Sequence, residues 1–199
     1  MKKLTVFLAA LVTVSLIGCA TGVKRVDVKE EIDLSGRWND TDSRLVSEEM
    51  ISDAIKHPWH KRFKRNNDGK LPVVIVGAVQ NRSHEHINVQ TFTKDLERAL
   101  INTGEVDFVA SSTEREELRE ERKDQAIHAS EETAKMAGAE MGADFMVKGS
   151  INTIQDAAGG KSVMYYQVNL ELIHIETNKK VWIGEKKIKK LIKQSRFGF

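Results

Sequence analysis

The apolar run VVIVGAV at Val73–Val79 decides the fold. The run is continuous and rich in β-branched residues, which is typical of a strand that is buried on both faces of a sheet. Leu71-Pro72 precedes it, and the polar loop Gln80–Ser83 follows it. A strand of this kind needs covering layers, so the run predicts an α/β domain with Val73–Val79 inside its sheet.

Helical patterns lie on both sides of this strand. Before it, apolar residues recur at helical spacing from Leu45 to Ile55. Thr41 or Asp42 is the expected cap of that helix, and Pro58 marks its expected end. After the strand we expect a helix at Val89–Thr103, a short strand at Val106–Val109, and a helical region from a capping box at Thr113–Glu116 to about Met141. This last region is either continuous or broken near Ala129-Ser130.

Three strands are expected to finish the chain. Apolar and polar residues alternate from Phe145 to Thr153 and again from Met164 to Leu172, and a shorter alternation includes Val181–Ile183. Alternation of this kind is typical of a sheet with one apolar face and one wetter face. Strands linked through helices and then a meander predict a mixed sheet flanked by helices.

The N-terminus has the pattern of a lipoprotein signal. Two lysines and an apolar stretch lead to LIGC at Leu16–Cys19, where a small residue precedes the only cysteine of the chain. This order of residue types is typical of a lipobox, in which the cysteine is lipidated and becomes the first residue of the mature protein. The alternatives are an ordinary cleaved signal with a chance cysteine, or a short anchor.

The sequence therefore divides into a signal peptide at 1–18, a tether at 19–40 and a single domain at 41–199. Ala20 follows the cysteine, and aspartate in that position is the enterobacterial signal for retention in the inner membrane. We therefore expect attachment to the periplasmic face of the outer membrane through lipidated Cys19. With no second cysteine, stability has to come from a packed core and not from a disulfide.

Overall charge is uninformative about partners. Removal of Lys2 and Lys3 with the signal lowers the basic residues from 31 to 29, which equals the 29 acidic residues. The neutral mature chain gives no reason to expect nucleic-acid binding. Two local stretches are basic: Lys56 to Lys70, which includes Lys61, Arg62 and Lys64, and Lys179 to Arg196. These stretches are either solvated faces or a docking surface for an acidic partner, anionic lipid or a wall polymer.

The sequence contains none of the common catalytic signatures: G-x-S-x-G, Walker A, H-E-x-x-H and C-x-x-C are all missing. His84 and His86 flank Glu85, but two histidines supply too few ligands for a zinc site. We expect no metal, no cofactor and no enzymatic activity.

Two polar spots are candidate partner-binding sites. Trp38 joins the tether to the domain, where it either packs the tether down or is exposed as an anchor, since Trp and Arg are enriched in interface hot spots. Asn81 and Arg82 follow the central strand, where loops of α/β sheets carry function. A hydrogen-bonded turn is the alternative reading of Asn81 and Arg82.

The ordered set of these segments resembles the LpoB family. The segments are the lipobox, GRWNDTD at Gly36–Asp42, VGAVQNRSHEHI at Val76–Ile87, GADF at Gly142–Phe145, GSI at Gly149–Ile151, and VWIGE at Val181–Glu185. The resemblance implies an outer-membrane lipoprotein that activates a class A penicillin-binding protein by contact, through a domain like the N-terminal domain of TolB. The enterobacterial tether is long and rich in proline, whereas this one is short and has none.

Two other classes of protein are possible. A CsgG-like secretion lipoprotein also combines a lipid anchor with an α/β domain, but it inserts pairs of amphipathic strands into the membrane. This chain has no spare alternating stretches outside the expected sheet. A periplasmic wall-remodelling enzyme would need catalytic motifs that are missing here.

Overall fold

The computed structural model describes residues 22–129 and 140–193. The chain divides into two units, Met1–Glu31 and Ile32–Phe199. In the first unit, a turn forms where the Glu30 amide donates to the Asp27 carbonyl. The expected signal peptide and Cys19 lie outside the described residues.

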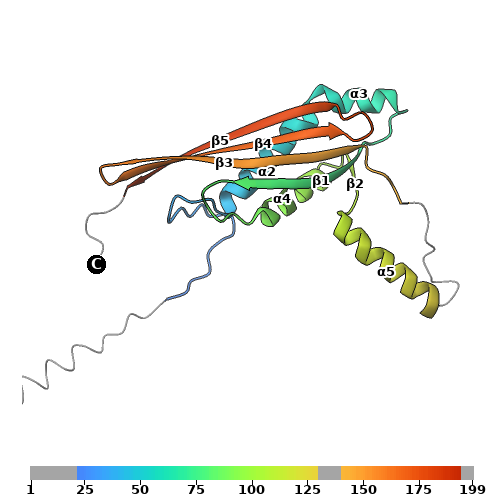
Figure 1. Cartoon of the computed structure of the whole chain (residues 1–199), viewed down its shortest axis with the longest axis horizontal. Coiled ribbons are helices and arrows are strands. Elements are labelled where there is room, and N and C mark those ends of the chain that lie inside the picture. The colour runs from blue at the N-terminus through green and yellow to red at the C-terminus, as the bar shows by residue number, and fades with distance from the viewer. Residues whose placement is uncertain (1–21, 130–139, 194–199) are drawn as a thin grey trace, which may run out of the picture. The chain divides into compact units, whose positions relative to one another are not determined.

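The second unit contains a five-stranded mixed sheet in the order β2-β1-β3-β4-β5 (Figure 1). Strand β4 pairs antiparallel with both β3 and β5, whereas β1 pairs in parallel with both β2 and β3. The strands are β1 Val73–Arg82, β2 Asp107–Phe108, β3 Phe145–Ala158, β4 Lys161–His174 and β5 Lys180–Lys193. The predicted α/β class and mixed sheet are confirmed.

Helices α2 (Asp40–Lys56) and α4 (Val89–Asn102) pack against each other, with α2 also on β5 and α4 on β1. Their apolar stripes meet the alternating residues of the strands. The buried core includes Val46, Ile51, Phe92, Leu96, Val74, Ile151, Tyr166, Leu170 and Trp182. The helical side chains of this core pack against one face of the sheet, which we call the inner face. The opposite face is the outer face.

Helix α3 (Pro58–Asn66) is absent from the sequence prediction, which took Pro58 only as the end of a helix. Proline stands at the first position of α3, where its missing N–H costs nothing. Helix α2 also begins earlier than expected. Its cap is Asn39, whose side chain accepts from the Asp42 amide while the Asp42 carboxylate accepts from the Asn39 amide.

Helix α5 (Ser112–His128) ends at the expected break near Ala129-Ser130, with Ala129 as its C-cap. The capping box is formed by Ser111 and Glu114 and not by Thr113 and Glu116. Residues 130–139 of the expected region lie outside the described residues, and 140–142 are not helical. None of the α5 residues is buried.

Glycines allow the strands to approach closely and to turn. A Cβ on Gly149 would lie 2.5 Å from the Asn169 carbonyl oxygen of β4, so only glycine fits between these strands. Gly159 and Gly160 connect β3 to β4 with φ angles of +57° and +73°, which two-residue hairpin turns with a type I′ backbone require.

Candidate functional site

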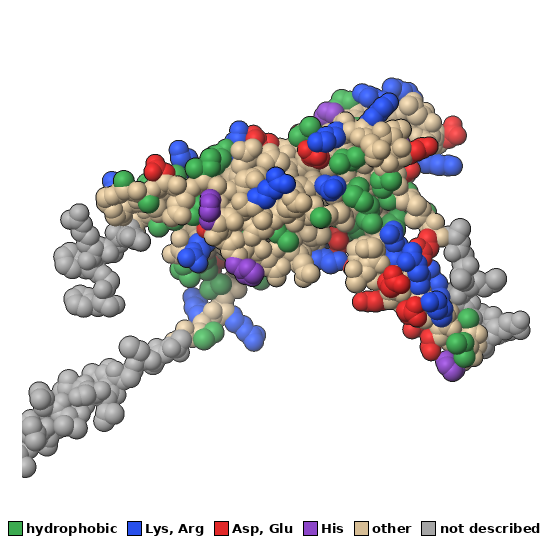
Figure 2. Space-filling view, viewed as in Figure 1, with side chains coloured by type: hydrophobic (Ala, Val, Ile, Leu, Met, Phe, Trp, Pro, Cys, Tyr) green, Lys and Arg blue, Asp and Glu red, His purple; other side chains and the backbone are tan. Residues whose placement is uncertain are grey.

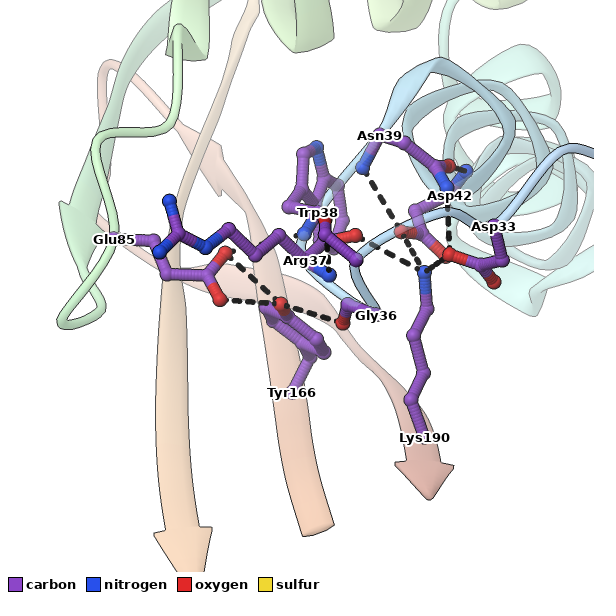
Figure 3. Close-up of polar contacts among 10 residues, drawn as sticks. Asp33, Gly36, Arg37, Trp38, Asn39, Asp42, Glu85, Tyr166 and Lys190 are labelled. Carbon is purple, nitrogen blue, oxygen red and sulfur yellow. Dashed lines mark hydrogen bonds and ion pairs between the residues drawn. The ribbon is translucent and has the colours of Figure 1, made fainter. Parts of the chain in front are cut away.

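Residues 33–39, expected to belong to the tether, make specific contacts inside the second unit; we call them the 33–39 segment (Figure 3). Gly36 adopts φ +70°, and a Cβ there would lie 2.5 Å from Cγ1 of Ile192 on β5. Glycine therefore allows the backbone of the segment to lie directly against the sheet. The Gly36 carbonyl accepts a hydrogen bond from the Tyr166 hydroxyl at 3.4 Å.

Glu85 fastens this segment from the loop after β1. Its carboxylate accepts from the Trp38 amide at 3.1 Å and from the Tyr166 hydroxyl at 2.9 Å. Burial of Tyr166 raises the pKa of its phenol, and the hydrogen bond to Glu85 is the second largest cause of this rise. Glu85 therefore joins three parts of the chain that are far apart in sequence: the 33–39 segment, the loop and β4.

The Trp38 ring packs into the inner face. It contacts Phe92 with ring centroids 5.9 Å apart and Tyr166 at 5.6 Å, both in edge-to-face geometry. Trp38 is half-buried. Of the two readings of this residue, the structure favours packing of the segment onto the domain over an exposed anchor, and a direct role in partner binding stays a prediction.

A buried ion cluster holds the same segment to β5. The Lys190 ammonium lies 2.6 Å from the Asp42 carboxylate and 2.9 Å from Asp33, and it also donates to the Arg37 carbonyl. The side chains of Lys190 and Asp42 are only 11% and 8% exposed. Burial raises the pKa of Asp42 although Lys190 opposes this. Burial would lower the pKa of Lys190, but its hydrogen bonds to the two carboxylates outweigh that cost and raise it.

The C-terminal basic stretch is therefore not one solvated surface. Because β5 alternates, Lys190 and Lys186 point to the inner face, where Lys186 pairs with Glu49 of α2. Lys187 and Lys189 lie on the outer face, and Lys187 pairs with Glu185 at 2.6 Å. Arg196 lies outside the described residues.

Asn81 and Arg82 end β1 and are exposed. The Asn81 side chain donates to the Glu85 carbonyl and accepts from the Ser83 amide, so it forms the turn that positions Glu85. The Arg82 guanidinium donates to the Gln80 side chain and borders an open hollow of about 240 Å³ on the outer face, with Lys148, Ser150 and Glu171 among its lining residues. Arg82 is thus accessible to a partner.

The basic residues of α3 lie near the start of β1. His60 of this helix bonds the Glu105 carbonyl just before β2, and β2 pairs with the first residues of β1. Lys64 also pairs with Glu105 at 3.2 Å, while Lys61 and Arg62 are exposed. A ten-residue strand spans roughly 30 Å. The structure therefore places Arg82 and the α3 cations at opposite ends of β1 and does not bring them together.

The residues around Glu85 hold the fold together and do not resemble a metal centre. His84 contacts Thr153 through Nδ1 at 3.1 Å. Within residues 22–129 and 140–193, no group of three or more His, Cys, Asp or Glu side chains is placed to hold a metal ion. In the same part of the chain, no helix is both long and apolar enough to cross a membrane.

The polar clusters of this domain fasten its N-terminal segment, and its accessible cations lie on open surfaces. The fold and these contacts define an α/β domain that carries its N-terminal segment bound against the sheet. The chain belongs to the family described as peptidoglycan-synthase activator LpoB, whose family model matches residues 42–188. The match extends from α2 into β5 and confirms the resemblance seen in the sequence. The expected likeness to TolB stays a prediction.

Solved structures similar to this chain include LpoB domains of low sequence identity. The C-terminal domain of LpoB from Salmonella enterica is 18% identical, with 75% of this chain and 99% of that one covered and a TM-score of 0.42. The corresponding Escherichia coli domain is 17% identical over 75% and 99%, at 0.41. The NMR structure of E. coli LpoB is 15% identical over 90% and 86%, at 0.43. No curated protein matches the chain.

Proposed function

We propose that this protein is an outer-membrane lipoprotein that binds a class A penicillin-binding protein and accelerates its synthesis of peptidoglycan. The family match over residues 42–188 carries the proposal, because it includes nearly all of the α/β domain. The lipobox at Leu16–Cys19 and the following Ala20 support attachment to the periplasmic face of the outer membrane.

Activation by contact requires that the domain bind the active conformation of the synthase more tightly than the inactive one. Arg82 is the candidate hot spot, because its guanidinium is exposed beside a polar hollow and, among the residues that the structure describes, it hydrogen-bonds only to the neighbouring Gln80. Lys61 and Arg62 are exposed on α3 at the other end of β1. Charges of that kind guide association more than they hold a complex together. The domain itself catalyses no step in this proposal.

The first test concerns the anchor. Substitution Cys19→Ser is expected to abolish incorporation of radiolabelled palmitate and to release the protein from the membrane fraction, while circular dichroism of the purified protein stays unchanged. The cysteine precedes the compact unit that begins at Ile32, so its loss leaves the core intact. Equal palmitate label in the variant and the wild type would rule out lipidation of Cys19.

The second test concerns the activator role. The chain from Ala20 to Phe199 is expected to have no wall-polymerising or wall-degrading activity alone, and to raise the rate of lipid II consumption by its cognate class A synthase. Arg82→Ala is expected to weaken this effect by about 1–3 kcal/mol. The double substitution Lys61→Glu and Arg62→Glu is expected to change mainly the association rate and its salt dependence.

Arg98→Ala is the matched control, because Arg98 is also an exposed arginine paired only with a near neighbour, Asp95 of the same helix. It is expected to behave as wild type at both low and high salt. Turnover of lipid II by the protein alone would refute the non-enzymatic mechanism. Full stimulation by Arg82→Ala would place the contact elsewhere on the domain.

A further inference from the structure

The outer face carries an unusual surface at the end of the sheet where β3 turns into β4. We call it the distal patch and define it by Ile154, Tyr165, Leu191, Lys161, Lys189 and Lys193. Figure 2 shows scattered hydrophobic, basic and acidic side chains at this end of the strands. Ile154 and Leu191 are 65% and 60% exposed. Tyr165 and Val163 of β4 lie between them, so the apolar groups continue across the three strands. A contiguous apolar surface of this kind marks an interaction site.

Strand register places these six side chains together. Ile154 is opposite Tyr165, and Tyr165 is opposite Lys189, so the three form one row across β3, β4 and β5. Val163 and Leu191 form the next row, and Lys161 and Lys193 the last. Directly opposite residues share a face of the sheet, so aliphatic and aromatic groups lie in the middle of the patch with lysines around them.

The lysines of the patch are available to a partner. Lys161, Lys189 and Lys193 form no ion pair with any residue in the described part of the chain. Three acidic side chains lie on the same face. Asp156 is opposite Val163, Glu185 binds Lys187 and Gln167, and Glu171 pairs with Lys180. The unpaired charge of the patch is therefore mainly positive and suits an anionic partner.

The place where the 33–39 segment is attached to the sheet favours one kind of anionic partner for the distal patch. Asp33 is bound to Lys190, and Gly36 lies against Ile192. Lys190 and Ile192 are the residues on either side of Leu191 in β5. The chain leaves the domain at the same end of β5 as the distal patch. From Ala20 to Ile32 an extended chain reaches at most about 45 Å. A membrane that holds Cys19 is therefore within reach of the patch.

We propose that the distal patch lies on the anionic phospholipid surface of the membrane that anchors the chain. Ile154, Tyr165 and Leu191 enter the boundary between headgroups and acyl chains, and Lys161, Lys189 and Lys193 contact the phosphates. A lipid anchor at the end of a tether leaves the orientation of the domain free, and a basic apolar patch is the kind of second contact that fixes this orientation. The tether argument depends on the proposed lipidation of Cys19, but the patch itself does not.

The test uses the unlipidated chain from Ala20 to Phe199, which keeps the whole unit from Ile32 onward. We expect it to sediment with vesicles of phosphatidylethanolamine and phosphatidylglycerol and not with phosphatidylcholine vesicles. Each lysine near an anionic surface contributes about 1 kcal/mol, so Lys189→Glu with Lys193→Glu is expected to weaken binding more than tenfold. Lys61→Glu with Arg62→Glu is the matched control on α3 and is expected to bind as wild type.

A second measurement reports contact directly. Because this chain has no cysteine, Leu191→Cys can carry a single environment-sensitive fluorophore. Its emission is expected to shift to the blue on the anionic vesicles, whereas the same label at Ile101→Cys on α4, which is 52% exposed, is expected not to shift. An unshifted label at residue 191, or equal vesicle binding by the charge-reversed patch and the wild type, would overturn the proposal. Binding of soluble poly-glutamate but not of vesicles would identify an acidic protein as the partner instead.

Discussion

Replacement of Ile75 by aspartate is expected to unfold the domain. Ile75 lies in β1 between two parallel neighbours and is only 8% exposed, although it faces the outer side of the sheet. An unpaired carboxylate in such a position costs several kcal/mol, on the order of the roughly 5–15 kcal/mol that stabilises a typical domain. Far-ultraviolet circular dichroism and urea unfolding of the chain from Ala20 measure the loss.

The same substitution at Ile183 is the control. Ile183 lies on the outer face of β5 and is 63% exposed, so an aspartate there stays in water. We expect the Ile183→Asp protein to unfold cooperatively within about 1 kcal/mol of wild type. A folded, monomeric Ile75→Asp protein would show that the outer side of β1 is accessible to water and that burial on both faces is not required there.

The sequence predicted the sheet well because its strands have a strong local signal. The alternation from Met164 to Leu172 in β4 follows from a single requirement, that one face is buried and the other wet. Helix α3 was missed because proline both ends one helix and begins another, and only the tertiary contacts of Trp59 and Phe63 with Phe145 decide between these outcomes. The start of α2 was misplaced for a similar reason: Asn39, Thr41 and Asp42 are all good caps.

The contacts of the 33–39 segment could not be predicted in the same way. Lys190 stands in a lysine-rich stretch, and its neighbours in sequence give no sign that it pairs with Asp42, 148 positions earlier. The histidines on either side of Glu85 likewise give no sign that its carboxylate binds the Tyr166 hydroxyl. Strand alternation is the one signal that could have placed Lys190 on the inner face, because it shares the parity of Trp182 and Ile188.

Loss of Glu85 is expected to detach the 33–39 segment and to destabilise the domain by about 3 kcal/mol. The Glu85 carboxylate accepts hydrogen bonds from both the Trp38 amide and the Tyr166 hydroxyl. A hydrogen bond to a charged group contributes roughly 1.5–3 kcal/mol. In Glu85→Ala the Tyr166 hydroxyl keeps only its long contact with Gly36. Detachment exposes the bond after Arg37 to trypsin. Limited proteolysis with mass spectrometry is therefore expected to give a new fragment that begins at Trp38.

Glu185→Ala is the matched control, since the Glu185 carboxylate also has two partners, Lys187 and the Gln167 side chain, but binds them at the exposed surface of β5. It is expected to leave both the unfolding free energy and the cleavage pattern unchanged. A double-mutant cycle with Tyr166→Phe separates the two hydrogen bonds of Glu85. Tyr166→Phe removes the bond from this hydroxyl to Glu85, together with its long contact to Gly36, and leaves the bond from the Trp38 amide to Glu85. If Glu85 acts as described, the double variant destabilises the domain by less than the two single changes added together. Strict additivity, or a Glu85→Ala protein as resistant to trypsin as wild type, would mean that Lys190 and the Trp38 ring hold the segment without Glu85.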